Sequence, residues 1–268
     1  HLFEAALGDQ PLARPVLGRE ASILALTRDD CLNWLATEYR PSRLVIAAAG
    51  SVDPDATLSL AERLFGDLEA VEPPAIPSAS FVGGIRSDRK AAEQTHLAFA
   101  LPGLPSSHDD APALALFSQA VGGGMSSRLF QELREDRGMA YSIYSWTQGF
   151  ADTGLFAVNL STDKARAAEA MALARDCVRR AADDLTDAEL NRARAQIEAG
   201  IIMALETPQG RADSIARSIE IFGRIMTLDE MLAELRAVTA NDARTAAQTM
   251  LGGPIALASI GGKLALAA

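Results

Sequence analysis

Two residues with hydrogen-bonding side chains, Arg134 and Tyr141, lie seven positions apart in the segment GGGMSSRLFQELREDRGMAYSIYSW, which spans residues 122–146. A guanidinium group and a phenol that reach the same point form a pair of donors for a peptide carbonyl or a developing oxyanion. Each residue also has a structural explanation, since arginine in a last helical turn complements the helix dipole and tyrosine is favoured in strands. The pair is therefore a candidate contact to an acyl substrate.

A helix and a strand joined by a tight turn are expected to position these two residues. The pattern predicts a helix over residues 126–137, ended by Gly138 in a left-handed conformation. A strand over residues 141–148 is predicted to follow. Arg134 then lies in the last helical turn and Tyr141 at the start of the strand, so that both side chains reach the same region.

No zinc-binding motif accompanies the pair. The chain contains three histidines, His1, His96 and His108, and neither HExxH nor HxxEH occurs. His96 on a strand and His108 in a loop have no ligand-like neighbours, and neither is assigned to catalysis. Cys31 and Cys177 lie far apart in predicted helices, which argues against a disulfide framework and a thiol zinc site. We therefore expect this chain by itself to bind no metal ion and no other cofactor.

The composition is that of a globular protein with a substantial core. Of the 268 residues, 49% are hydrophobic and 22% are charged, and the net charge is −10. A nucleic-acid partner is not expected, because phosphates require a basic surface. No membrane is expected either, because no apolar run reaches the roughly 18–20 residues of a spanning helix. The N-terminus resembles the interior of a longer polypeptide, and the expected compartment is the cytoplasm, with the periplasm as the alternative.

The first part of the chain is expected to contain a helix followed by a strand. Thr27 caps a helix over residues 28–39, in which Leu32 and Leu35 face inward at helical spacing. Residues 44–49, with the sequence LVIAAA, form an apolar run that is typical of a strand buried on both faces.

A further helix, a linker and a second set of elements are predicted after that strand. Asp53 and Pro54 open the helix, and residues 68–80, rich in proline, alanine and serine, form the linker. The later expected strands are 95–101, 141–148, 155–160 and 255–260, and the second and third of these form a hairpin through Gly149 and Gly154. The expected helices are 111–121, stopped by the glycines that follow, 126–137, 163–182, one capped by a Thr186–Glu189 box, those after Pro208 and Thr227, and 240–251.

A weak internal repeat relates the two parts of the chain. A shift of 212 residues without a gap aligns Thr27 with Thr239, Asp30 with Asp242 and Gly50 with Gly262. In both copies the pattern predicts a threonine-capped helix, followed by an apolar strand that ends in glycine. A chance coincidence is one explanation. The other is that the first part is the tail of one domain and the second part a complete second copy.

The segment around Arg134 resembles the second-domain signature of the inverzincin metallopeptidases, the group of pitrilysin, insulinase and mitochondrial processing peptidase. The resemblance extends outward, since LGDQPLARPVLGREASILALTRDDCLNWLATEYRPSRLVIAAAGSVDPD is similar to the end of the family's first domain. THLAFALPGLPSSHDDAPALALFSQAVGGG is similar to the start of its second domain. The resemblance covers nearly the whole chain.

The resemblance implies an α+β fold made of duplicated domains, each a mostly antiparallel sheet with helices packed on one face. Residues 1–67 would be the C-terminal part of the first, zinc-type domain, residues 68–80 the linker and residues 81–268 the second domain. In the family, the first domain supplies HxxEH and a further glutamate ligand. The second domain supplies an arginine and a tyrosine near the substrate, and by resemblance these are Arg134 and Tyr141.

The function implied is that of the C-terminal portion of a zinc-dependent metalloendopeptidase, which cleaves peptides or presequences enclosed between two homologous domains. A preceding N-terminal peptidase half would hold the zinc ion, and the chain alone would be inactive. The expected partners are a peptide substrate, that half, and a second copy or a family member in a homodimer or heterodimer. The alternative is a non-catalytic homologue that serves as a peptide-binding or scaffold subunit of a heteromeric peptidase.

Overall fold

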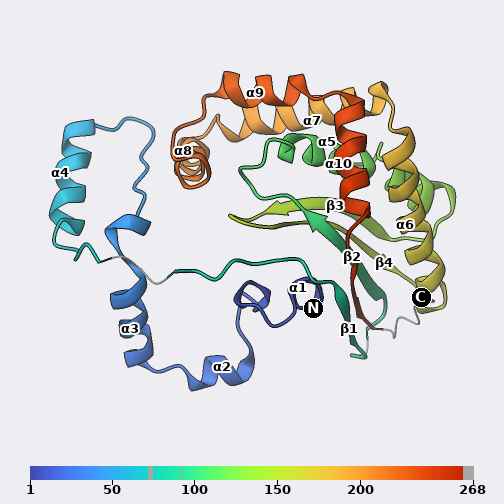
Figure 1. Ribbon diagram of the computed structural model, residues 1–268, viewed down its shortest axis with the longest axis horizontal. Helices are drawn as coiled ribbons and strands as arrows, with labels where there is room; N and C mark the ends of the chain where they lie inside the picture. Colours follow the sequence, from blue (N-terminus) through green and yellow to red (C-terminus); the bar gives the residue numbers. More distant parts are fainter. Residues whose placement is uncertain (72–74, 91, 262–268) are drawn as a thin grey trace. The chain divides into compact units, whose positions relative to one another are not determined.

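A computed structural model describes residues 1–71, 75–90 and 92–261. The chain divides into two compact units, whose elements are labelled in Figure 1. The larger unit comprises His1–Arg14, Ala79–Ala199 and Asp229–Ala268, and the smaller comprises Pro15–Ser78 and Gly200–Leu228.

The larger unit is built on a sheet to which the described residues contribute five strands in the order β1-β5-β2-β4-β3. The strands are β1 (Gly84–Asp88), β2 (Thr95–Gly103), β3 (Ser142–Gly149), β4 (Gly154–Thr162) and β5 (Ala256–Ile260). β1 pairs with β5 in parallel, and the other neighbours are antiparallel. The predicted α+β class is confirmed, as is the hairpin of β3 and β4. β1 was not predicted, because GIRSD has a single large apolar residue and no alternation.

Three of the described helices cover one face of this sheet. The helical segments of the larger unit are α1 (Leu2–Leu7), η1 (Pro11–Ala13), α5 (Ala111–Gly122), η3 (Phe130–Asp136), η4 (Lys164–Arg166), α6 (Ala167–Asp184), α7 (Asp187–Ala204, mostly in this unit), α9 (Leu228–Ala237) and α10 (Ala240–Leu251). α5, α6 and α10 contact one another and the strands (Figure 1). Phe117 of α5 lies 6.0 Å from Phe156 of β4, centroid to centroid, and both rings are fully buried. Burial of a ring of this size contributes roughly 2–3 kcal/mol.

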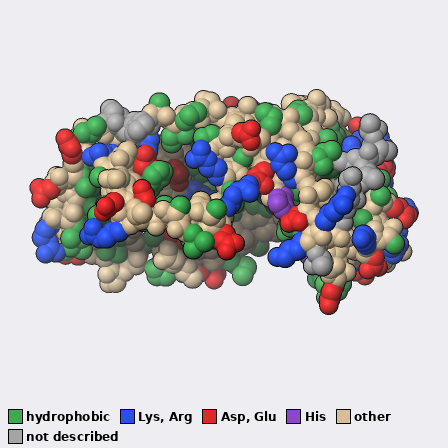
Figure 2. Space-filling view, turned by 90° about the horizontal axis from the view of Figure 1, so that it is seen from below, with side chains coloured by type: hydrophobic (Ala, Val, Ile, Leu, Met, Phe, Trp, Pro, Cys, Tyr) green, Lys and Arg blue, Asp and Glu red, His purple; other side chains and the backbone are tan. Residues whose placement is uncertain are grey.

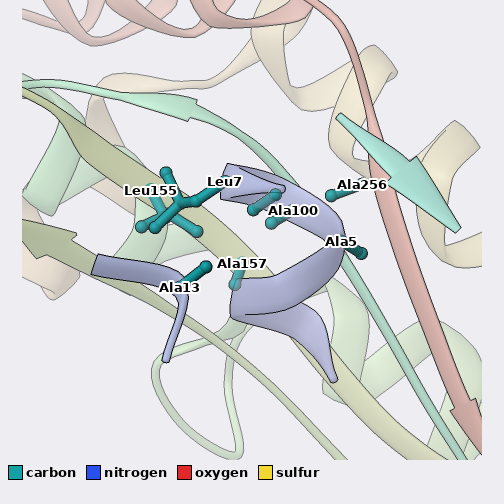
Figure 3. Close-up of a cluster of buried hydrophobic side chains, with 8 residues drawn as sticks. Ala5, Leu7, Ala13, Ala100, Leu155, Ala157 and Ala256 are labelled. Atoms are coloured by element: carbon teal, nitrogen blue, oxygen red, sulfur yellow. The ribbon is translucent and has the colours of Figure 1, made fainter. Parts of the chain in front are cut away.

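The N-terminal segment packs on the opposite face of the sheet. Ala5 and Leu7 of α1 and Ala13 of η1 form a buried cluster with strand residues (Figure 3). The strand members of the cluster are Ala100, Leu155, Ala157 and Ala256. Because most of these side chains are methyl groups, α1 lies close to the strands, and the centre of the sheet is covered on both faces.

The smaller unit is helical. Its helical segments are α2 (Glu20–Ala25), α3 (Arg28–Glu38), η2 (Pro41–Arg43), α4 (Pro54–Phe65) and α8 (Pro208–Phe222). The predicted caps are confirmed: Thr27 accepts from the Asp30 amide at 3.2 Å, and Asp53 accepts from the amides of Asp55 and Ala56. The described part of the predicted linker, residues 68–71 and 75–80, contains no helix or strand, and residues 72–74 lie outside the described residues.

Two predictions for the first part of the chain were wrong. Leu32 and Leu35 are exposed rather than inward-facing, and no described residue between Pro15 and Ser78 is buried. The backbone is extended at Leu44, but residues 44–49 form no strand within the described part of the chain. A strand exists only where a second strand accepts its hydrogen bonds, and none of the described residues pairs with this segment.

Charges of both signs are interspersed on the face of the molecule seen in Figure 2. On that face, the picture shows no continuous basic track of the kind that a phosphate backbone requires.

Candidate functional site

The segment that carries Arg134 is a π-helix, η3 (Phe130–Asp136), which follows a short α-helical start at Arg128 and Leu129. A helix was predicted over residues 126–137, and its position is confirmed, while its π type is a feature that the prediction did not specify. In a π-helix each amide bonds one residue further back than in an α-helix, and such segments are rare and frequent at functional sites. Sequence periodicity does not separate the two helix types over so short a span.

Buried leucines and a glycine determine where η3 lies and where it ends. Leu129 and Leu133 are fully buried, so that one side of the helix is anchored in the core. The amides of Met139 and Ala140 both donate to the Leu133 carbonyl, at 2.7 and 3.2 Å. Gly138 has φ 53°, which confirms the predicted left-handed turn. The chain thereby reverses between η3 and β3.

Arg128 attaches the start of this segment to α6 and α7. Its guanidinium donates to Glu189 at 2.6 Å and also pairs with Asp184. Glu189 in turn accepts from the Thr186 amide at 2.9 Å, which confirms the predicted cap of α7. Burial alone would raise the pKa of the Glu189 carboxyl, but the hydrogen bonds from Arg128 and Thr186 lower it to about 2. Arg128 and Glu189 therefore form an ionised pair at neutral pH.

A second ion-pair group holds the outer side of η3. Glu132 accepts from Arg180 at 2.6 Å and lies 3.6 Å from the Arg137 guanidinium. Arg180 also donates to Asp176 at 2.8 Å, within α6.

Cys177 of α6 is a buried thiol next in sequence to Asp176. Burial raises the pKa of the Cys177 thiol to about 12, so this thiol stays protonated and unreactive at neutral pH.

The glycines before η3 allow a close approach of α5 to β3. A Cβ atom at Gly122 would lie 2.5 Å from the Ser145 amide nitrogen, so no larger residue fits. Gln119 donates to the Gly123 carbonyl at 3.0 Å and to Gln196 of α7 at 2.8 Å. The predicted helix stop is confirmed, and the contact with β3 supplies a further reason for glycine.

Arg134 is held differently from the other arginines of this region. Its guanidinium carbon lies 4.7 Å from the centroid of the Phe130 ring, in the geometry of a cation–π contact. Its nearest carboxylate is that of Glu135, 3.9 Å from Nε, and its side chain is 44% exposed. The N–H donors of Arg134 therefore remain accessible.

Tyr141 directly precedes β3. Its backbone amide donates to the Ser161 carbonyl of β4 at 2.9 Å, which fixes the backbone, while the residue is 72% exposed. The structure places Arg134 and Tyr141 at the two ends of one short turn. Among the described residues, no hydrogen bond joins the two side chains, and both present free donors.

The histidines are held by local contacts. His1 lies 3.3 Å from Glu4, His108 accepts from the Asp110 amide at 3.0 Å, and His96 is exposed on β2. The described part of the chain contains no group of three or more His, Cys, Asp or Glu residues that could hold a metal ion. The described residues therefore do not fit a zinc ion. No helix among them is long and apolar enough to cross a membrane.

Comparison with protein families identifies this segment. Residues 25–197, more than half of the chain, match the model of the peptidase M16 inactive domain. The chain belongs to the peptidase M16 family. The metallopeptidase resemblance of the sequence is thereby confirmed, and the matched range contains Arg134 and Tyr141.

Relatives and solved structures agree with the M16 assignment. An uncharacterized zinc protease of Streptomyces coelicolor is 37% identical over 95% of this chain and 58% of its own length. A crystal structure of a peptidase M16 inactive domain from Pseudomonas fluorescens superposes with a TM-score of 0.85 at 22% identity, covering 99% of this chain and 65% of that one. A chain of complex III from Candida albicans superposes with a TM-score of 0.87 at 22% identity, covering 98% and 65%. The two superpositions show the fold alone. The chain spans somewhat more than half the length of the curated relatives.

Proposed function

We propose that this chain is the C-terminal portion of a zinc-dependent endopeptidase, in which Arg134 and Tyr141 contact the substrate peptide. The accessible donors of Arg134 carry this proposal. A guanidinium whose N–H groups are not taken by a carboxylate is able to bind a peptide carbonyl or the oxyanion formed from it. Tyr141 offers a second donor at the other end of the same turn.

The first 67 residues are, in this proposal, the last part of a preceding domain of the same type. The repeat supports this interpretation, because the Thr27–Asp30 and Thr239–Asp242 capping boxes are both present and have nearly equal distances. A shift of 212 residues also maps α3 onto α10. Gly262, the last partner of the repeat, lies outside the described residues. In the second copy, β5 follows the helix and is paired on both sides, whereas residues 44–49 have no partner strand among the described residues.

The zinc ion belongs, in this proposal, to polypeptide that precedes the chain in the full-length protein. The names of the curated relatives suggest zinc, while the described residues offer no ligand cluster. The role of this chain would then be to bind and orient the peptide.

Turnover of the full-length protein tests the roles of the two residues. We expect Arg134→Ala and Tyr141→Phe each to lower kcat by about 10²-fold, the usual effect of losing one oxyanion donor. Arg192→Ala is the control, because it removes an exposed arginine of α7 outside η3 and is expected to change kcat by less than about twofold. The measurement is cleavage of a fluorogenic peptide with circular dichroism of each variant. Unchanged turnover in both site variants would contradict the assignment.

The same assay separates the endopeptidase from a non-catalytic subunit. An endopeptidase loses turnover on treatment with a chelator and regains it when zinc is added. A scaffold or peptide-binding subunit would show peptide binding without turnover. The chain shares its fold with a chain of complex III, and this likeness is the reason to test the second function.

A further inference from the structure

The contact between Phe130 and Arg134 joins the first residue of η3 to the arginine of the candidate site. We propose that Phe130 is a positioning residue, whose ring holds the Arg134 guanidinium through a cation–π contact and leaves its N–H groups free for the substrate. The proposal rests on the function proposed above for Arg134.

The geometry of a guanidinium explains why a ring is suited to this task. The group is planar, and its five N–H donors all lie in the plane. The Arg134 guanidinium carbon lies over the Phe130 ring, 4.7 Å from its centroid. Such a ring attracts the cation but is not a hydrogen-bond acceptor of the carboxylate kind for its N–H donors. A carboxylate would instead accept from the donors that a peptide carbonyl needs.

The other arginines around η3 show the opposite arrangement. Arg128 donates to the carboxylates of Glu189 and Asp184. Arg180 donates to Glu132, and Arg166 donates to the carbonyl oxygens of residues 137 and 138, at 3.1 and 2.8 Å. These side chains use their N–H donors to hold the fold together, whereas the Arg134 guanidinium lies over an aromatic ring.

The nearby carboxylates do not compete for Arg134. Glu132 is engaged by Arg180 and Arg137, and Glu135 lies 3.9 Å from the Nε atom of Arg134, beyond hydrogen-bond distance. Phe130 is itself half-buried and follows the fully buried Leu129. Holding a long side chain before the substrate arrives reduces the rotamer freedom that is lost on binding.

Substitutions of Phe130 in the full-length protein test this role. We expect Phe130→Leu to lower kcat/KM for peptide cleavage about three- to tenfold, because the leucine side chain has no π face. Phe130→Tyr keeps the face and should remain within about twofold of the wild type. Thermal unfolding of each variant measures any general loss of stability.

A double-mutant cycle separates positioning from a structural role. If Phe130 acts through Arg134, then Phe130→Leu has no further effect on kcat/KM in an Arg134→Ala background. A further loss of similar size in that background would overturn the proposal, as would failure of Phe130→Tyr to restore activity. If Arg134→Ala alone leaves turnover unchanged, the role of Arg134 fails and the proposal fails with it.

A spectroscopic measurement on the zinc-free protein is independent of turnover. The Nε–H resonance of Arg134 should show a ring-current shift that is lost in Phe130→Leu and kept in Phe130→Tyr. An Arg134 resonance that does not change in Phe130→Leu would show that the ring does not hold the guanidinium, even if Arg134 proves necessary for cleavage.

Discussion

Arg128 is the residue that joins the start of η3 to the turn between α6 and α7. Its two carboxylate partners, Glu189 and Asp184, come from different helices, so that a single side chain fixes three segments. Glu189 is the more constrained partner, because it also forms the cap of α7 with Thr186. The ionised form of Glu189 is therefore favoured by the native state.

The stability of the protein should consequently depend on the ionisation of Glu189. The carboxyl has a pKa near 4.5 when unperturbed and about 2 in the folded protein. Because the folded value is lower, the contribution is complete above about pH 4.5 and is lost as the pH falls toward 2. We expect Glu189→Gln and Arg128→Gln to have a lower Tm at pH 6 and a smaller fall in Tm between pH 5 and 3. An unchanged pH dependence in both variants would contradict this linkage.

At the scale of elements, the approach of α5 to β3 sets the position of the loop that leads into η3. Ser145 of β3 donates through its hydroxyl to the Ser118 carbonyl of α5 at 2.7 Å, which fixes the two elements side by side. Gly122 lies at this contact, where the Ser145 backbone leaves no room for a side chain. The glycine is thus required by packing between elements.

Substitution of this glycine should be costly. We expect Gly122→Ala to destabilise the fold by roughly 1–3 kcal/mol, because the added methyl group would force α5 and β3 apart. Gly200→Ala is the matched control: an added methyl group would meet no described atom within 4 Å, and alanine is favoured within a helix such as α7. The free energy of unfolding in urea should be lower for Gly122→Ala, and unchanged or slightly higher for Gly200→Ala. Equal stability of Gly122→Ala and the wild type would exclude a tight contact between α5 and β3 at this position.

At the scale of the whole molecule, the segment between Pro15 and Ser78 exposes many large apolar side chains. The most exposed of these include Val16, Leu17, Leu24, Trp34, Leu58, Leu64 and Ile76. Large exposed apolar surfaces mark places where another polypeptide binds. This pattern agrees with the proposal that a preceding domain half covers the segment in the full-length protein.

Hydrogen exchange tests that proposal. In the 268-residue chain alone, the amides of residues 44–49 should exchange rapidly, because these residues have no β-ladder partner among the described residues. In the full-length protein they should be protected, as expected for a strand within a sheet. The amides of β4, which is paired on both sides, serve as the internal reference and should be protected in both proteins. Rapid exchange of residues 44–49 in the full-length protein would contradict a strand at this position.

Local sequence signals predicted much of the fold and part of the site. The caps at Thr27, Asp53, Thr186 and Thr239, and the left-handed turn at Gly138, are confirmed because each depends on residues within one helical turn. The hairpin followed from strand patterns and turn residues, whereas the α+β class was implied by the family resemblance. Arg134 and Tyr141 were selected by their spacing and by a family resemblance, and their roles remain predictions.

Other features depend on contacts between residues that are distant in the sequence. The predicted helix takes the π form where Leu129 and Leu133 are both buried in the core, and residues 44–49 form no strand because no described strand pairs with them. The sequence by itself determined where the helices begin and where the chain turns, since side-chain caps and glycine conformations act locally. Only the tertiary structure decided which apolar faces are buried and which segments pair as strands, since burial and pairing require a partner that local sequence does not contain.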